Sequence, residues 1–207
     1  MEKSGLVQVF LLMLALSFMV AGCAGSANYE MPDKYTGIER IDGATTDIVR
    51  NEKPIKNAGA FKNIIIESFN VSSELRTDYP SEIYQFESTL ITHLRGRDIF
   101  DSVEKSEIGD RGRHKDDSIR VEGEVLDMRI TGTAARAWGG ALAGSSYMDI
   151  SLRFVDEKNG DVINEKIIAT HNNALAAAWS GGHSDQSLPT DMAEIISEYI
   201  LTVVPSE

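Results

Sequence analysis

The first regular pattern of apolar positions lies between residues 61 and 103. Residues 61–69 form a run rich in β-branched side chains, which is typical of a buried strand. Pro80 then opens an amphipathic helix that Gly96 is suited to end. Its apolar positions share one face: Ile83, Phe86, Leu90 and Leu94. The pattern predicts a strand, this helix, and a second short strand over residues 99–103.

Three further strands follow in the second half of the chain. Residues 119–131 form a long strand whose apolar positions change parity, which predicts a β-bulge near Val125. Residues 148–154 alternate cleanly between apolar and polar, as in a half-buried strand. Asn159-Gly160 is typical of a type I′ hairpin turn, and residues 162–169 supply its second strand.

The chain is expected to close with a helix capped by Ser187 or Thr190. Its inner face carries five apolar residues: Met192, Ile195, Ile196, Tyr199 and Ile200. The order of elements predicts a single α/β domain. We expect a mixed sheet of about five strands with two main helices, in which the last three strands form a meander.

The first 22 residues have the pattern of an export signal. A short charged start precedes an apolar run from Leu6 to Val20, which is shorter than the roughly 20 residues of a membrane span. The run ends in Val-Ala-Gly-Cys, which resembles a bacterial lipobox. Cys23 is the only cysteine in the chain, so an internal disulfide is excluded. The sequence predicts a signal peptide over residues 1–22 and lipidation of Cys23.

The resemblance to bacterial lipoproteins also indicates a location. Ala24, rather than Asp, follows the cysteine, which implies sorting to the outer membrane with the domain facing the periplasm. Acyl chains such as palmitate contribute about 0.8 kcal/mol per buried CH2, so two or three of them anchor a protein stably. Residues 23–58 are polar, contain Pro32 and Pro54, and are predicted to form a flexible tether. Residues 59–207 form the predicted periplasmic domain.

The net charge is strongly negative, at −12. A broad interaction with nucleic acid or with anionic lipid headgroups is therefore not expected, because both carry negative charge. One basic cluster contains Arg111, Arg113, His114 and Lys115, but Gly112 interrupts it and aspartates flank it. We interpret this cluster as a solvated loop.

Motifs of enzyme chemistry are absent from the sequence. It contains no Gly-x-Ser-x-Gly elbow, no P-loop and no His-Glu-x-x-His, and Gly139, Gly140 and Gly144 do not have the spacing of a dinucleotide fingerprint. His171 and His183 flank one loop, but the sequence shows no third ligand for zinc. We predict a protein that is not an enzyme and has no cofactor and no metal.

Both tryptophans lie in similar small-residue segments. Trp138 belongs to ARAWGGALAG and Trp179 to AAAWSGGHS, and each segment follows a predicted strand. A meander of three strands places the two segments at the same edge of the sheet. The predicted contact residues are Trp138, Gly139, Gly140, Gly144, Trp179, Gly181 and Gly182.

Two interpretations of these tryptophans remain open. In the first, they only cap the core or pack on each other, with the glycines turning the chain. Alternatively, they form a surface that contacts lipid or another protein, since Trp combines an apolar ring with an N–H group that can stay hydrated.

The segment from Val121 to Lys166 resembles an uncharacterised lipoprotein family, domain of unknown function 4410. The shared pattern is a Val-x-Gly strand, a Gly-rich loop with an arginine, an amphipathic strand and an Asp-x-x-x-Gly-Asp-Val hairpin. The segment is more distantly similar to the curli secretion channel lipoprotein, and this resemblance implies a ring of subunits. In those channels, insertions at the two loop positions form membrane hairpins, whereas the loops here lack lipid-facing strands of about ten residues.

These observations lead to two hypotheses of function. The first is a non-enzymatic outer-membrane lipoprotein that forms a homo-oligomer or docks an envelope partner in envelope assembly or export. The second is a monomeric adaptor that binds and regulates an envelope enzyme.

Overall fold

The computed structural model describes residues 32–110, 117–172, 179–180 and 183–205. The long elements are α4 (Pro80–Gly96), β5 (Ser118–Arg129), β6 (Tyr147–Asp156), β7 (Val162–His171) and α7 (His183–Val203). Shorter elements that precede β5 include α2 (Thr46–Val49), β2 (Asn63–Glu67), β3 (Asn70–Val71), α3 (Ser73–Asp78) and β4 (Ser102–Ser106). The remaining elements are β1 (Arg40–Ile41), α5 (Thr133–Gly139) and the 3-10 turns η2 (Asp33–Tyr35), η3 (Ala58–Ala60) and η4 (Gly140–Ala143).

The strands form one mixed sheet, which confirms the predicted fold class. Its order is β1-β7-β6-β5-β2-β4, and β3 pairs with β5 outside this path. The β5, β6 and β7 strands form the predicted antiparallel meander, whereas β1, β2, β3 and β4 pair in parallel. The sheet contains seven strands rather than about five, because β1 and β3 are only two residues long.

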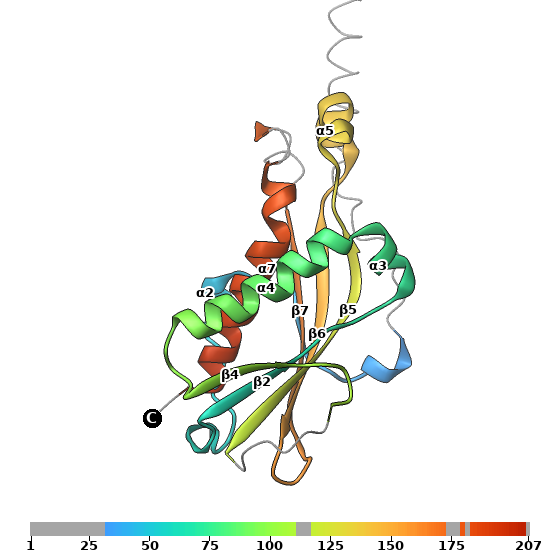
Figure 1. Cartoon of the computed structure of the whole chain (residues 1–207). Helices are drawn as coiled ribbons and strands as arrows, with labels where there is room; N and C mark the ends of the chain where they lie inside the picture. The colour runs from blue at the N-terminus through green and yellow to red at the C-terminus, as the bar shows by residue number, and fades with distance from the viewer. Residues whose placement is uncertain (1–31, 111–116, 173–178, 181–182, 206–207) are drawn as a thin grey trace, which may run out of the picture.

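Helices α4 and α7 lie across one face of the sheet (Figure 1). The predicted apolar face of α4 is buried, and so is that of α7. Strands β5 and β6 bury Val121, Ile150 and Leu152 beneath them. The main hydrophobic core therefore lies between this sheet face and the two helices.

A close approach of two elements explains the glycine of the Val-x-Gly pattern. The ring of Phe69 lies over Gly123 of β5, and a Cβ atom at Gly123 would be 2.2 Å from Phe69 Cε1. The same ring packs edge-to-face on Phe86 of α4, with ring centroids 4.8 Å apart. Only a residue without a side chain fits beneath Phe69.

The structure confirms one predicted irregularity and corrects the bounds of one strand and the type of one turn. The β-bulge is confirmed between Val125 and Asp127. The second short strand lies at Ser102–Ser106, not at 99–103. The hairpin turn after β6 is not type I′, because only Gly160 has a positive φ (77°) and its N–H donates to the Asp156 carbonyl. Five residues thus connect the strands, where a type I′ turn has two.

The last helix begins earlier than predicted, at His183. Proline inside a helix lacks the N–H that bonds to the preceding turn, so Pro189 concealed the first two turns in the sequence. Tertiary contacts hold these turns, since Asp185, Leu188 and Pro189 are all buried. Packing therefore outweighs the local preference.

Residues 32–58 differ from the expected tether. Tyr35 and Ile38 pack with Leu126 and Ile167 in a small second cluster, and β1 pairs with β7. Lys34 Nζ also lies 2.8 Å from Glu124 Oε2. Polar composition predicted a flexible chain here, but isolated apolar residues anchor the segment along the sheet. Residues 1–31, including Cys23, lie outside the described residues, so the signal peptide and the lipid anchor remain predictions.

Candidate functional site

The meander brings both tryptophan segments to the same end of the sheet, as predicted. Arg129 at the end of β5 pairs with Tyr147 at the start of β6, and Tyr147 pairs with His171 at the end of β7. We call residues 132–145 the first arm and residues 172–184 the second arm. In Figure 1, α5 of the first arm projects beyond the sheet at the end where α7 begins.

The first arm is a helical hairpin rather than a loop. It comprises α5 followed directly by η4, and two of its glycines adopt positive φ: Gly140 at 52° and Gly144 at 87°. Such values favour glycine, so both residues shape the turns of the arm. Arg129 Nη2 donates to the Ala143 carbonyl at 2.9 Å and thereby holds the end of the arm against β5.

Three large apolar side chains among the described residues of the arms are largely exposed. Trp138 is 94% exposed, Leu142 77% and Trp179 91%. We call these three residues the tip. Such exposure excludes the interpretation that the tryptophans cap the core or pack on each other. Gly139 and Gly140 adjoin Trp138 in the first arm, whereas Gly181 and Gly182 lie outside the described residues.

A buried polar cluster joins the bases of the two arms. Ser146 Oγ donates to Asp185 Oδ1 at 2.6 Å and accepts a hydrogen bond from the Thr131 N–H at 2.8 Å. The Ser146 carbonyl accepts from the Asn172 N–H at 2.8 Å, and the Asn172 amide donates to the Ser184 carbonyl. We call Thr131, Ser146, Asn172 and Asp185 the clasp. Ser146 and Asp185 are both fully buried.

A second bond joins the arms nearer the surface. Gln186 Nε2 on α7 donates to Thr133 Oγ1, the first residue of α5, at 2.8 Å. The sequence did not reveal this bond or the clasp, because their members lie far apart in the chain and follow no repeating spacing.

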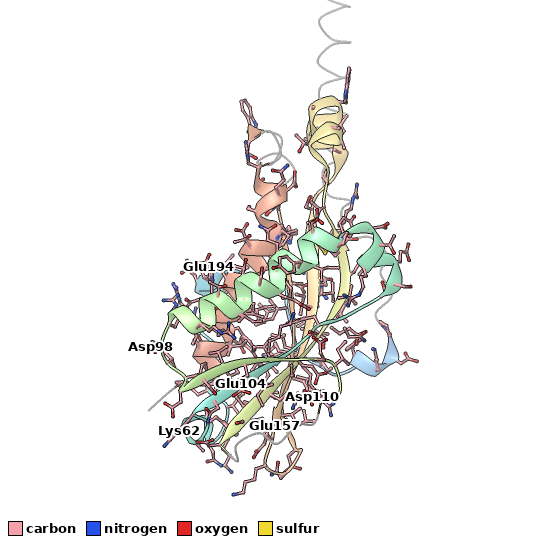
Figure 2. The ribbon with its side chains drawn as sticks, in the orientation of Figure 1. Lys62, Asp98, Glu104, Asp110, Glu157 and Glu194 are labelled. Atoms are coloured by element: carbon pink, nitrogen blue, oxygen red, sulfur yellow. The ribbon has the colours of Figure 1, made fainter. Side chains whose placement is uncertain are left out.

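The buried charged cluster around Arg120 is internally paired. Arg120 is fully buried, and its guanidinium lies 2.6 Å from Glu157 Oε1 and 3.2 Å from Glu67 Oε2. Figure 2 shows the acidic side chains Glu104, Asp110 and Glu157 on the body, toward the end opposite α5. The tip and these acidic residues therefore occupy different ends of the molecule.

One polar pocket of about 370 Å³ lies beside Lys166, Glu52 and Tyr199. Lys166 Nζ is 2.8 Å from both Glu39 Oε2 and Glu52 Oε2. Burial lowers the pKa of Lys166, but hydrogen bonds to the two carboxylates outweigh it and leave the pKa above its ordinary value. An amine that stays protonated at neutral pH is a poor base and a poor nucleophile, so this pocket gives no support for amine chemistry.

The remaining candidate residues from the sequence are two histidines and one basic cluster. His171 and His183 are both exposed. Within residues 32–110, 117–172, 179–180 and 183–205, no group of three or more His, Cys, Asp or Glu side chains is arranged to hold a metal ion. The basic residues Arg111, Arg113, His114 and Lys115 lie outside the described part. In that part, no helix combines the length and the apolar character needed to cross a bilayer.

Comparisons with known proteins assign no family to the chain. No family model matches it, and neither does any curated protein. The resemblance to domain of unknown function 4410 therefore stays a prediction.

Among solved structures, the chain is similar to the PelC dodecamer from Paraburkholderia phytofirmans. The identity is 16%, the TM-score is 0.45, and the match covers 68% of this chain and 89% of that one. It is also similar to protein XCC0632 from Xanthomonas campestris, of family DUF330, at 8% identity and a TM-score of 0.43, covering 78% and 94% of the two chains. TM-scores below 0.5 assign neither a family nor a function.

Proposed function

We propose that the protein is a non-enzymatic lipoprotein of the outer membrane that faces the periplasm and associates with itself or with an envelope protein through the tip. The observation that carries this proposal is the exposure of both tryptophans at one end of the sheet. Each buried Trp removes about 150–250 Å² from water, which contributes on the order of 4–6 kcal/mol. Two exposed tryptophans and Leu142 thus provide a strong drive for contact.

The chemistry of the tip favours an apolar contact. Between Thr133 and Ser145, Arg136 is the only charged residue. The acidic side chains that dominate the composition are therefore kept out of the first arm. A surface of this kind suits the interfacial zone of a membrane or an apolar patch on a neighbouring subunit.

The predicted lipid anchor is near enough to the domain to hold the tip at the membrane. Lys34 is held beside Glu124, which lies five residues before the end of β5. About nine residues separate Cys23 from Pro32 and span at most about 30 Å when extended. A lipid on Cys23 would thus keep the domain, and its tip, close to the membrane surface.

The proposal is tested by removing both tryptophans from the full chain with Trp138→Ala and Trp179→Ala. Light scattering in detergent measures the mass of the assembly, and flotation of a Cys23→Ser form with neutral phospholipid vesicles measures membrane contact. We expect association to weaken about tenfold or more, which equals about 1.4 kcal/mol. The thermal midpoint should stay within about 2 °C, because exposed side chains contribute little to stability.

Tyr84→Ala is the matched control, since Tyr84 is a 73% exposed aromatic residue on α4 rather than on an arm. The two assays also separate the contacts. Loss of mass without loss of flotation identifies a subunit contact, and the reverse identifies lipid. A parent chain that is monomeric in detergent and does not float with vesicles contradicts self-association and lipid contact through the tip, and favours the monomeric adaptor.

A further inference from the structure

Hydrogen bonds link the places where the two arms join the body. The first arm leaves the body after Thr131 and returns at Ser146, whereas the second begins at Asn172 and ends in the first turn of α7, which contains Asp185. The four residues of the clasp therefore lie where the two arms join the body. Ser146 touches each of the other three, through its hydroxyl and its carbonyl.

Burial of the Asp185 carboxylate has a cost in free energy. This cost is explained if the protein needs its two arms in one fixed arrangement. A carboxylate removed from water costs several kcal/mol, which hydrogen bonds must offset. Asp185 lies in the first turn of α7, where the helix dipole favours a negative charge, and it accepts the Ser146 hydroxyl at 2.6 Å. A short, charge-assisted bond of this kind fixes both partners in one geometry.

We infer that the clasp is a positioning device that holds Trp138 and Trp179 in one fixed relative arrangement, so that the two tryptophans act as a single contact surface. This inference rests on the proposed function for its purpose but not for its geometry. Gln186 supplies a second restraint nearer the surface through its bond to Thr133.

The inference is tested by measuring the distance between the arms. Spin labels on Leu142→Cys and Trp179→Cys occupy exposed tip positions and leave the clasp intact. Pulsed distance measurements use the full chain in detergent, diluted with unlabelled chain, and a chain without added cysteines corrects for Cys23. We expect a single narrow distance distribution, which Ser146→Ala and Asp185→Ala broaden about twofold or more, because the remaining bonds do not fix the arms.

Two substitutions serve as matched controls. Ser197→Ala removes another buried serine hydroxyl from α7, and Asp191→Ala removes a carboxylate that accepts the Ser187 hydroxyl at 2.9 Å on the same helix. Neither residue belongs to the clasp, so neither should change the distance distribution. If the clasp variants do not fold, Gln186→Ala decides the matter, since it removes only the exposed restraint and should broaden the distribution to a smaller extent.

Unchanged distributions in folded Ser146→Ala and Asp185→Ala chains, or in Gln186→Ala where those variants do not fold, would overturn the inference, whatever happens to association. The proposed function is read separately, from the mass and flotation of Ser146→Ala with both tryptophans in place. Broader distances with weaker association support both ideas. Broader distances with unchanged association support the clasp but count against a joint action of the two tryptophans.

Discussion

The aromatic residues packed between the sheet and the helices differ from those at the tip in how their apolar surface is used. Phe69, Phe86, Phe154 and Tyr199 are fully buried, and they form two edge-to-face pairs between the sheet and the helices. Trp138 and Trp179 leave more than nine tenths of their surface in water. Aromatic surface thus stabilises the folded chain where it is buried, whereas at the tip it remains free for an external contact.

This difference teaches that stability and contact are separable in this molecule. Substitutions under the helices should change the free energy of unfolding. Substitutions at the tip should change association instead. The clasp lies between the two regions, because three of its four residues are as buried as the core yet they restrain the exposed arms.

The largest effect on stability is expected from Gly123→Ala. The new Cβ would lie 2.2 to 2.7 Å from three atoms of the Phe69 ring, so Phe69 must move and disturb its contact with Phe86. We expect the free energy of unfolding to fall by about 2–3 kcal/mol, the upper part of the usual range for overpacking. Urea unfolding followed by circular dichroism measures this change.

Gly132→Ala supplies the control at the base of the first arm. A Cβ at Gly132 meets no atom within 4 Å, and the backbone there does not have a positive φ. The free energy of unfolding should change by less than about 0.5 kcal/mol. Equal losses at the two glycines would show that the body and the arm are not energetically distinct.

Most of the body follows from the sequence because its signals are local. The alternation over residues 148–154 and the helical spacing of Ile83, Phe86, Leu90 and Leu94 each arise within one element, and the structure confirms both. The change of parity near Val125 located the bulge for the same reason.

The segment over residues 32–58 was misjudged for the opposite reason. Its buried residues, such as Tyr35, Ile41 and Val49, occur singly, and β1 is only two residues long. No period marks such a segment, and its pairing with β7 joins residues more than a hundred positions apart. Only tertiary contact shows that it belongs to the domain.

The site was predictable in part. The meander placed Trp138 and Trp179 at one end of the sheet, since antiparallel strands alternate in direction. Their exposure was not predictable, because a Trp among glycines suits a core cap as well as a contact surface. The bond between Ser146 and Asp185 was invisible, since the two residues are 39 positions apart.

A smaller effect, of opposite sign, is expected from Thr131→Val at the base of the first arm. The backbone N–H of Thr131 belongs to the clasp, but its buried side-chain hydroxyl has no hydrogen-bond partner among the described residues. An unsatisfied buried hydroxyl costs about 1–3 kcal/mol, and valine has nearly the same shape. We expect the free energy of unfolding to rise by about 1 kcal/mol in urea titrations.

Ser146→Ala is the matched comparison for this prediction, because its hydroxyl both donates and accepts a hydrogen bond. Its removal should lower the free energy of unfolding. A loss of stability in Thr131→Val would mean that the threonine hydroxyl also takes part in the clasp.

The smallest effect concerns alkaline pH and should arise in the body. Burial raises the pKa of the Tyr199 phenol from 10.0 to about 12. Between these values the unfolded chain has lost the proton while the folded chain keeps it, so the free energy of unfolding falls as pH rises. At pH 11 this single group accounts for a loss of about 1 kcal/mol relative to pH 9. Tyr199→Phe should remove that part of the pH dependence, although it also loses the hydrogen bond from Asn164.

Urea unfolding at pH 9 and pH 11 measures the effect, with Tyr84→Phe on the exposed side of α4 as the control. The slope between the two pH values must become smaller in Tyr199→Phe and stay unchanged in Tyr84→Phe. Burial lowers the pKa of Lys166, but hydrogen bonds to Glu39 and Glu52 outweigh it and leave this pKa raised. A smaller fall of the free energy of unfolding with pH should therefore survive in Tyr199→Phe. If the slope is instead the same in all three chains, the alkaline sensitivity does not come from Tyr199 of α7. It then comes from other groups with a raised pKa, such as Lys166 in the body or Tyr147 at the base of the arms, whose pKa burial raises to about 12.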